Sequence, residues 1–589
     1  MPKSLLDSGS EFDVCRARLG QWLRGVTAKP RTLLSPELGA YTKHVFKAGW
    51  AISLVHDGET YRFDVLVDGR FPYSAIRVAL TSKDMFLKWP HVEPRGLLCL
   101  PLASSPIVDV SEAADAALAS ALQLIDQCRQ ANFVQSELRR EFLSYWDHAT
   151  HDNEKPVYSL LNPSNHSARS IAVWFGQQFA LVGEDAVQVR TWLSHRGRTE
   201  PSTIVAGVFG HLGEAPVPPF PDRPTELFEL LADQSPETLR VLDKCPCKRD
   251  VIVVLGATSP SGDGLMAVRI TSPNTHGFRK SQCNRPSIKM TLWRTRSEVR
   301  RAEIARFDAA WVHGRGLNQA LPKLQAAKVL LLGCGSLGSQ VAVRLAQSGV
   351  GHLTLVDPDK LSPANVGRHA LGVAETGQNK AVALATELRH RFSHMHAVEG
   401  HGVPWQQFYH KHPDLFEAFD LIVACIGEWS AEGPLAEWQR REGGERPVVY
   451  GWLDERGTAA HALVLTGNVP GLSCVLGSDG NLRVPETIWQ NRGAIQSEPA
   501  CGTLFQPYGP IDMALAETLV SKLCLDVLIG SVSAPRHRIY ATSTEQLTAA
   551  GGKWSDEHLK HRPAGFEGAF EYDRPIDACQ QCDACKETA

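Results

Sequence analysis

The chain has 589 residues, enough for about three to five domains that each bury a core of their own. Its 61 Lys and Arg side chains against 64 Asp and Glu give a formal net charge of −3, and this balance excludes a surface built to bind nucleic acid nonspecifically. No apolar run reaches the ~18 residues of a membrane span, and the N-terminal segment contains no apolar signal-peptide core. We therefore expect a cytoplasmic protein that has neither a nucleic acid nor a membrane as its partner.

Residues 1–150 predict an α+β domain. Residues 61–67 and 74–80 alternate apolar and polar side chains, which is typical of half-buried antiparallel strands. Residues 112–146 contain neither Gly nor Pro and repeat apolar residues at helical spacing. They predict a long helix or a helix pair, for which Ser111 is available as a cap.

The rest of the chain changes character near residue 300. Residues 151–300 predict a connecting domain, in which the proline-rich segment 215–224 cannot form regular structure. Within residues 301–589, apolar runs alternate with helical patterns after Pro322, which predicts a parallel sheet with helices on both faces. The chain as a whole is predicted to be a multidomain α/β protein.

A glycine motif predicts a nucleotide site in this last part. Gly333, Gly335 and Gly338 follow an apolar run directly and open a helical pattern, so that backbone N–H groups and a helix N-terminus can receive phosphates. The next apolar run ends at Asp357 and Asp359, where a carboxylate can bind ribose hydroxyls. The motif alone does not separate NAD from ATP.

The residues after this run favour ATP. Asn365, Arg368 and Lys380 are expected within reach of the same strand ends. A hydride-transfer site has little use for two fixed cations, whereas attack of a carboxylate on ATP builds negative charge on the phosphates that must be neutralised. The pattern therefore favours adenylation. The alternative is that Arg368 and Lys380 are solvated surface charges.

Residues 300–545 resemble the ubiquitin-activating family of adenylyltransferases, which includes the activators of sulfur-carrier proteins, because GxGxxG, VDPD, NxxR and GQxK occur in that family's order. The resemblance implies a Rossmann-like adenylation domain that binds ATP and magnesium through Asp357, Asp359, Asn365, Arg368 and Lys380. The metal-binding aspartate that the family carries after the next strand is absent here. Glu428 lies one position away from the place of that aspartate and is the candidate Mg ligand. The family also supplies an arginine from before the first strand, for which Arg306 and Arg315 are candidates.

Cys501 lies in a loop around residues 470–510, just before a strongly apolar helical pattern. A cysteine in a polar loop near a helix start ionises more readily than a buried one. Its context resembles that of the thioester cysteine of ubiquitin activators, which implies that Cys501 captures the activated carrier. The alternative is an ordinary loop thiol.

Cys99 follows the two predicted strands, and His91 precedes it in the same segment. The arrangement resembles the ubiquitin-conjugating fold and extends over residues 1–150. It implies that Cys99 is a second thioester cysteine and that His91 polarises the thioester carbonyl or orients the loop. A surface histidine, and an inactive ubiquitin-conjugating-like domain, are the alternatives.

Three cysteines near the end of the chain, Cys579, Cys582 and Cys585, are separated by two residues each. Three thiolates at this spacing supply most of a zinc site, but no fourth ligand lies nearby in the sequence. A flexible tail with free thiols is the alternative.

The two halves together resemble the bacterial fusion of ubiquitin-conjugating-like and ubiquitin-activating-like proteins that occurs in CBASS antiphage operons. The resemblance implies a protein substrate with a C-terminal glycine, namely a cGAS-like nucleotidyltransferase, which becomes attached to target-protein lysines. It also implies a JAB-type deconjugating protease encoded in the same operon. Activation of a ubiquitin-like or sulfur-carrier protein, a noncatalytic nucleotide-binding scaffold and an NAD oxidoreductase remain alternatives. We expect a homodimer, because the connecting region is too structured to be a free tether between the two thiols. The alternative is a swing of the first domain within one chain.

Overall fold

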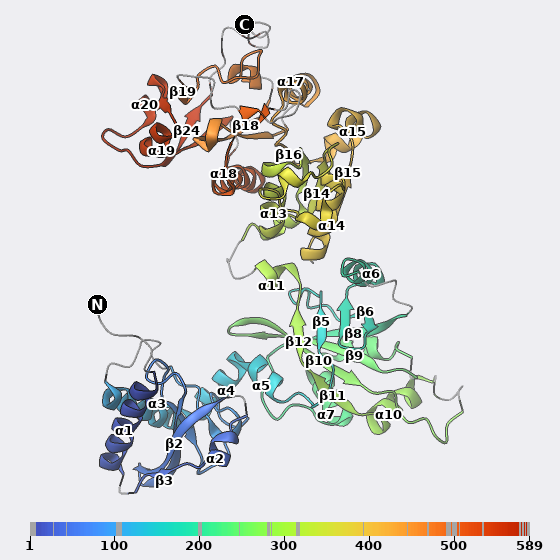
Figure 1. Ribbon diagram of the computed structural model, residues 1–589. Helices are drawn as coiled ribbons and strands as arrows, with labels where there is room; N and C mark the ends of the chain where they lie inside the picture. The colour runs from blue at the N-terminus through green and yellow to red at the C-terminus, as the bar shows by residue number, and fades with distance from the viewer. Residues whose placement is uncertain are drawn as a thin grey trace. The chain divides into compact units, whose positions relative to one another are not determined.

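The computed structural model describes residues 8–27, 29–42, 44–101, 109–197, 203–246, 248–279, 283, 285–313, 319–392, 394–443, 446–467, 470–489, 496–497, 504–505, 507–532, 535–576, 579, 582 and 585. The chain divides into two compact units, Met1–Val189 with Thr203–Ala305, and Arg190–Ser202 with Arg306–Ala589 (Figure 1). Cys501 and Arg315 lie outside the described residues. Within the described ranges, every helix is too short or too polar to cross a membrane.

The first unit begins with a four-stranded antiparallel meander in the order β1-β2-β3-β4. Its strands are β1 Arg31–Thr32, β2 Phe46–His56, β3 Glu59–Asp68 and β4 Arg77–Leu80, and a short helix, α2 Ser35–Gly39, lies between the first two. Helices α1 Ser8–Val26 and α3 Val110–Cys128 pack on this sheet through one apolar cluster, which includes Leu23 and Ile125. Both predicted strands are confirmed, although β4 begins three residues later than the alternation suggested.

The predicted helical run forms three helices: α3 is followed by α4 Ala131–Arg140 and α5 Phe142–His148. The prediction of Ser111 as the cap is wrong. Asp109 caps α3, because its carboxylate accepts hydrogen bonds from the backbone N–H of Ser111 at 2.7 Å and of Glu112 at 3.2 Å.

A second sheet follows, with eight strands in the order β11-β10-β9-β8-β6-β7-β5-β12. Its strands are β5 Val157–Ser159, β6 Arg169–Phe175, β7 Ala180–Gly183, β8 Ile204–Leu212, β9 Val251–Ser259, β10 Gly262–Ile270, β11 Val299–Ala302 and β12 Ile304–Arg306. The helices of this region are α6 Ala186–Ser194, α7 Pro224–Gln234, α8 Pro236–Leu242 and α10 Pro286–Arg296. Residues 215–223 of the proline-rich segment carry no helix or strand, as predicted, but the last residue of the predicted segment, Pro224, begins α7.

The third sheet has the order β15-β14-β13-β16-β17-β18-β22-β24. Its strands are β13 Lys328–Leu332, β14 His352–Val356, β15 Ala397–His401, β16 Leu421–Ala424, β17 Val448–Leu453, β18 Ala459–Leu465, β22 Arg536–Ala541 and β24 Phe570–Pro575. The first five are mutually parallel and the last three pair antiparallel. The parallel sheet predicted after Pro322 is thus confirmed, with an antiparallel extension.

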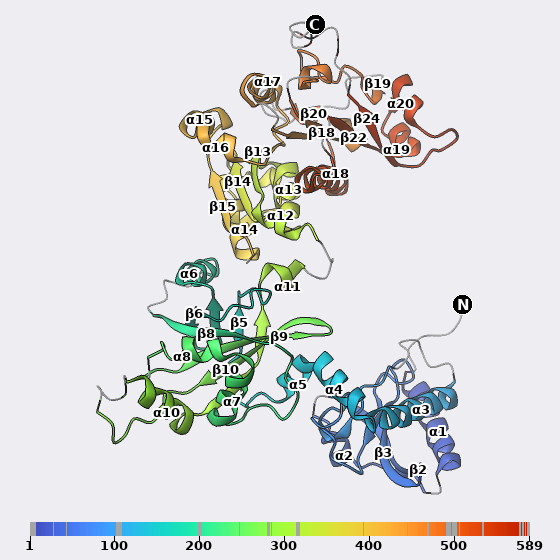
Figure 2. The ribbon, with the colours of Figure 1, turned by 180° about the vertical axis from the view of Figure 1, so that it is seen from behind.

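Helices cover both faces of this sheet (Figure 2). Val329 and Leu331 of β13 pack into the cluster that contains α13 Ser336–Gln347, α14 Lys380–Arg391 and α18 Pro510–Ile529. Leu330 and Leu332 point the other way, into the cluster of α15 Trp405–Lys411, α16 Pro413–Ala418 and α17 Trp429–Trp438. Because successive strand residues face opposite sides, burial on both faces requires the continuous apolar run seen in β13.

The remaining elements are short. They are α11 Ala309–His313, α12 Leu321–Ala326, β19 Thr487–Trp489, β20 Gln496–Ser497, β21 Leu504–Phe505, α19 Thr544–Ala549, β23 Gly552–Trp554, α20 Asp556–His561, the π-helix η5 Gln439–Gly443 and the 3₁₀ helices η1 Pro94–Gly96, η3 Pro363–Asn365, η4 Val373–Glu375, η6 Glu455–Gly457 and η7 Leu472–Cys474.

Candidate active site

The glycine turn lies at the switch point of the third sheet, where the neighbours of β13 are β14 on one side and β16 on the other. Gly333 has φ +86°, a left-handed conformation that favours glycine. A Cβ atom on Gly338 would lie 1.9 Å from the carbonyl oxygen of Gly333, so a side chain there would push the helix off the turn. Gly335 caps the 12-residue helix α13 without a side chain, which leaves the first N–H groups of the helix open to an anion.

Asp357 directly follows β14, and its buried carboxylate holds the backbone of the glycine turn in place. Its carboxylate accepts hydrogen bonds from the backbone N–H of Cys334 at 2.6 Å and of Asp359 at 2.8 Å. Burial raises the pKa of Asp357 above its ordinary value, and these two donors work in the opposite direction. Asp357 therefore fixes the backbone, and the exposed carboxylate of Asp359 is the one open to a ligand.

Lys380 and Asp359 form an ion pair where α14 begins, with 2.9 Å between the ammonium Nζ and the carboxylate Oδ2. Asn379, which the sequence reasoning missed, fixes this geometry. Its side-chain oxygen accepts from the N–H of Val382 as the helix cap, and its amide donates to the backbone oxygens of Asp357 at 2.8 Å and Asp359 at 3.0 Å. An Asn immediately before a helical pattern was the available signal.

Arg368 reaches the site from the segment after η3. Its guanidinium lies 4.7 Å from the ring centroid of Tyr508, and Nη1 is 3.5 Å from that residue's backbone oxygen. Arg368 Nε is buried and has no hydrogen-bond partner among the described residues. Asn365 supports the segment, since its backbone oxygen accepts from the N–H of Arg368 at 2.9 Å while its side-chain oxygen accepts from Ser362. Tyr508, which precedes α18, was not predicted.

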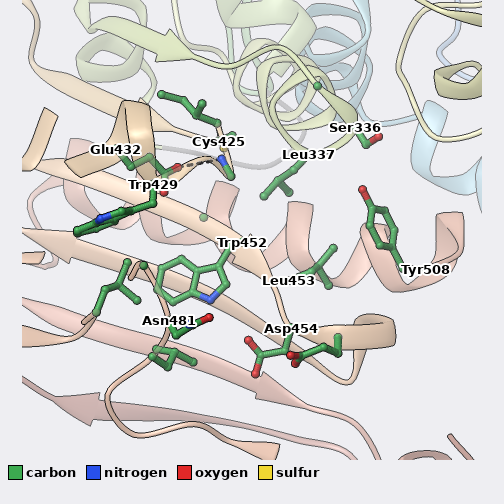
Figure 3. Close-up of a pocket in the computed structure, with 18 of the residues that line it drawn as sticks. Ser336, Leu337, Cys425, Trp429, Glu432, Trp452, Leu453, Asp454, Asn481 and Tyr508 are labelled. Atoms are coloured by element: carbon green, nitrogen blue, oxygen red, sulfur yellow. Dashed lines mark hydrogen bonds between the residues drawn. The ribbon is translucent and has the colours of Figure 1, made fainter. Parts of the chain in front are cut away.

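A cavity of about 820 Å³ opens beside the glycine turn, at the carboxyl ends of β16 and β17. Figure 3 shows the ring of Trp429 at one end, that of Tyr508 at the other, and Trp452 between them. Its lining residues include Gly335, Ser336, Leu337, Arg368, Cys425, Trp429, Glu432, Trp452, Asp454, Glu455, Asn481 and Tyr508. The structure thus brings Gly335 and Arg368 to the cavity wall, whereas Asp357, Asp359 and Lys380 gather at the end of β14.

Glu428 occupies the N-cap position of α17 and is not among the residues that line this cavity. Glu432, one turn later, does line it and accepts a hydrogen bond from the N–H of Gly427 at 3.0 Å. Burial raises the pKa of Glu432 to about 7. Asp454 and Glu455 add two further cavity carboxylates, and hard oxygen donors of this kind suit Mg²⁺.

Arg306 forms an ion pair with Asp308, two residues further along the chain. Its Nε and Nη2 atoms donate to the two carboxylate oxygens of Asp308 at 2.8 and 2.9 Å, and the guanidinium lies 4.8 Å from the ring centroid of Trp311. With both side chains of the ion pair buried, Arg306 is held in place by Asp308.

Cys99 is exposed, and its backbone N–H donates to the carbonyl oxygen of His91 at 2.9 Å. An isolated bridge from Leu97 to Ala79 ties the segment before it to β4, and a second bridge joins Leu98 to Val92 within the segment itself. Partial burial and the negative charge of Glu93 raise the pKa of the Cys99 thiol, and Arg77 partly offsets them. The resting thiol is therefore protonated at neutral pH.

His91 is oriented by residues that lie far along the chain. It has φ +59°, and its N–H donates to the hydroxyl of Tyr145 at 3.0 Å. Ring atom Nδ1 lies 3.3 Å from Glu141 and Nε2 lies 3.6 Å from Glu137, while Tyr145 donates to Glu141 at 3.1 Å. Helices α4 and α5 thus hold the ring beside the thiol segment, a support that no local pattern revealed.

Four cysteines form a cluster in the second unit. The sulfur of Cys474 lies 3.8 Å from that of Cys582 and 3.5 Å from that of Cys585, and Cys579 completes a set whose sulfurs are all within 4.8 Å of one another. The fourth ligand that the tail lacks locally comes from η7. Four thiolates at these separations match a closed tetrahedral zinc site.

Two family matches cover both sites. The ThiF family matches residues 313–449, which contain the glycine turn, Arg368 and Lys380. Prokaryotic E2 family B matches residues 31–154, which contain His91 and Cys99.

Two relatives and one solved structure are similar to parts of the chain. The ATP-dependent ubiquitin transferase-like protein Cap2 of Pseudomonas aeruginosa is 24% identical over 467 residues, which cover 75% of this chain and 80% of the relative. The adenylyltransferase and sulfurtransferase MOCS3 of Mus musculus is 39% identical over 104 residues, 18% of this chain and 22% of that protein. A crystal structure of E. coli MccB with MccA-N7isoASN aligns with TM-score 0.32 and 18% identity, covering 45% of this chain and 68% of MccB. The chain therefore carries a prokaryotic E2 family B domain within residues 31–154 and a ThiF-family domain within residues 313–449.

Proposed function

We propose that this protein is an ATP-dependent adenylyltransferase and thioester transferase that activates the C-terminal glycine of a carrier protein and conjugates it to lysines. The observation that carries the proposal is the meeting of an open helix N-terminus, Arg368 and the Lys380–Asp359 pair around one glycine turn. Two fixed cations beside a phosphate cradle serve phosphate chemistry better than hydride transfer.

In the first step the carrier carboxylate attacks the α-phosphorus of ATP. A carboxyl–phosphate bond forms, the bond to the β-phosphate oxygen breaks, and pyrophosphate leaves. Lys380 and Arg368 neutralise the charge that develops on the phosphates, and the α13 N-terminus donates N–H groups to them. Mg²⁺ would be held by cavity carboxylates such as Asp454 and Glu455, where it supplies further neutralisation.

The acyl group then moves between thiols. The thiolate of Cys501 attacks the acyl carbonyl and AMP leaves, after which Cys99 attacks the thioester and frees Cys501. A lysine amine attacks the Cys99 thioester, forms an isopeptide bond and releases the Cys99 thiol. We propose that His91 polarises the thioester carbonyl at Cys99, because two carboxylates and a tyrosine hold His91 beside the segment that carries Cys99.

For the biological setting we propose CBASS antiphage defence in the cytoplasm. The substrate would be the C-terminus of a cGAS-like nucleotidyltransferase, primed by attachment to target lysines, and a JAB-type protease would reverse the attachment. Similarity to Cap2 supports this setting. Similarity to MOCS3 supports the alternative, activation of a ubiquitin-like or sulfur-carrier protein.

We also propose that Cys474, Cys579, Cys582 and Cys585 bind a structural zinc ion that joins the chain end to η7. The sulfur–sulfur distances of 3.5 and 3.8 Å support this assignment, because tetrahedral Zn–S bonds of ~2.3 Å place sulfurs nearly that far apart.

The test is to incubate the purified full chain with ATP, Mg²⁺ and a candidate carrier ending in glycine, and to resolve the products on non-reducing gels. Carrier bands that thiol reagents remove are the expected result. A carrier with its last glycine deleted is the control. Pyrophosphate release without any thioester would contradict the transferase part of the proposal, and no carrier-dependent release from any candidate would contradict the adenylation part.

A further inference from the structure

The second sheet brings together two histidines and a carboxylate that belong to none of the sites described above. His211 lies near the end of β8, where it pairs with Gly256 of β9, and Asp263 of β10 pairs with Thr258 of the same central strand (Figure 1). Residues 256 and 258 are two apart on β9 and therefore share a face of the sheet. All four residues consequently lie on one face, with His211 and Asp263 on either side of β9.

The glycine in the central strand makes their approach possible. A Cβ atom on Gly256 would lie 2.8 Å from Cδ2 of His211, closer than real carbon contacts allow. Without that side chain, the imidazole leans across β9 toward Asp263. A glycine inside a central strand weakens the strand, so its presence under an imidazole marks a space that the histidine needs.

His166 completes the cluster from the loop between β5 and β6. Its ring stacks on that of His211 with a centroid separation of 3.7 Å, and its Nε2 lies 3.5 Å from Oδ2 of Asp263. The other carboxylate oxygen of Asp263 accepts a hydrogen bond from Thr258 Oγ1 at 2.9 Å, which fixes the carboxylate. Outer hydrogen bonds of this type orient the ligands of metal sites.

One polar atom in the cluster is left unsatisfied. His211 Nε2 is buried and has no hydrogen-bond partner within the described part of the chain. This ring nitrogen is therefore available to a ligand. A buried polar atom without a partner is costly, and a bound cation would remove that cost.

We propose that His166, His211 and Asp263 bind a divalent transition-metal ion such as zinc, which ties the loop between β5 and β6 to the second sheet. One ligand atom from each residue lies within 4.8 Å of the other two. Two imidazoles and one carboxylate form a ligand set that zinc uses when it keeps an open position. The site is separate from the adenylation and thioester chemistry and does not depend on it.

The test compares zinc content between full-length variants. Each chain is stripped with a chelator, dialysed against Zn²⁺ and analysed for bound zinc, and circular dichroism confirms its fold. We expect His211→Ala and Asp263→Asn each to hold one zinc ion fewer than the unaltered chain. His276→Ala, an exposed histidine in the same region, should lose none. Each result is the difference in zinc content between two chains that both contain the cysteine cluster. Zinc bound by that cluster therefore does not affect the result.

Two further readouts sharpen the test. Thr258→Val should weaken binding of this zinc ion by about 10- to 100-fold, since it removes only the hydrogen bond to Asp263. Zinc should also slow amide hydrogen exchange in residues 160–168 of the unaltered chain and have no such effect in Asp263→Asn. Equal zinc content in the unaltered chain, His211→Ala and Asp263→Asn would overturn the proposal.

Discussion

The ammonium of Lys380 lies 2.9 Å from the carboxylate of Asp359, where β14 ends and α14 begins. The two side chains differ in exposure, because Lys380 is 11% exposed and Asp359 is 67% exposed. The lysine is therefore fixed in position by its surroundings, while the carboxylate that pairs with it is open to solvent. A phosphate that arrives at the glycine turn can replace or share this partner without moving the lysine.

Replacing Lys380 by Ala should lower carrier-dependent ATP–pyrophosphate exchange on the order of a hundredfold. The loss of one contact that stabilises transition-state charge typically costs about 2.7 to 4 kcal/mol of barrier. Lys411→Ala, which removes an exposed lysine from α15, is the matched control and should exchange normally. Undiminished exchange by folded Lys380→Ala would remove Lys380 from the proposed site.

The charges around Cys99 predict opposite effects of two substitutions on the pKa of its thiol. Glu93 raises this pKa and Arg77 lowers it. Glu93→Gln should therefore lower the pKa and speed alkylation by iodoacetamide at pH 8, because the thiolate is the nucleophile. Arg77→Met should raise the pKa and slow alkylation. The pH profile of the alkylation rate measures both, and shifts in the same direction would contradict the electrostatic account.

Removal of one ligand should empty the cysteine cluster of zinc. Cys585→Ser should bind one zinc ion fewer per chain than the unaltered protein and should melt at a lower temperature, since binding at a structural site contributes to folding stability. Cys15→Ser, a cysteine outside the cluster, is the control. Unchanged zinc content in Cys585→Ser would refute the assignment.

Sequence periodicity was sufficient to predict the parallel part of the third sheet, but not its antiparallel strands β18, β22 and β24. The run around Leu330 and Leu331 is apolar at every position because each face of the sheet is covered, and glycine spacing located the turn that follows. These signals are local, so they can be read without knowing the fold. Tyr508 beside Arg368, and Cys474 beside the tail cysteines, could not be predicted in the same way.

Such contacts depend on how distant segments pack. Cys474 lies 108 positions from Cys582, and Tyr145 lies 54 positions from His91. No spacing rule relates residues that far apart, because the connecting elements can pack in many ways. The prediction of Ser111 as a helix cap failed for a smaller reason: Asp109 also suits that position, and the choice depends on where the helix begins.

The order of the two thiols can be tested with single substitutions. Adenylation needs no thiol, so Cys501→Ala should still form the acyl-adenylate but load neither cysteine. Cys99→Ala should accumulate carrier on Cys501. Mass spectrometry of trapped thioesters identifies the loaded residue. Normal loading of Cys99 in Cys501→Ala would mean that the acyl group passes directly from the adenylate.

The last prediction concerns the homodimer that we propose. Two cysteines that exchange one acyl group must come within bonding distance, and either a swing of the first domain within one chain or a partner subunit achieves this. If one chain's Cys501 serves the Cys99 of its partner, a mixture of Cys99→Ala and Cys501→Ala chains should regain conjugation that neither has alone. Only exchange between chains can restore the relay in that mixture. Subunit mixing is verified by pulling one tagged variant down with the other, and absence of conjugation despite mixing would refute the dimer and leave the swing.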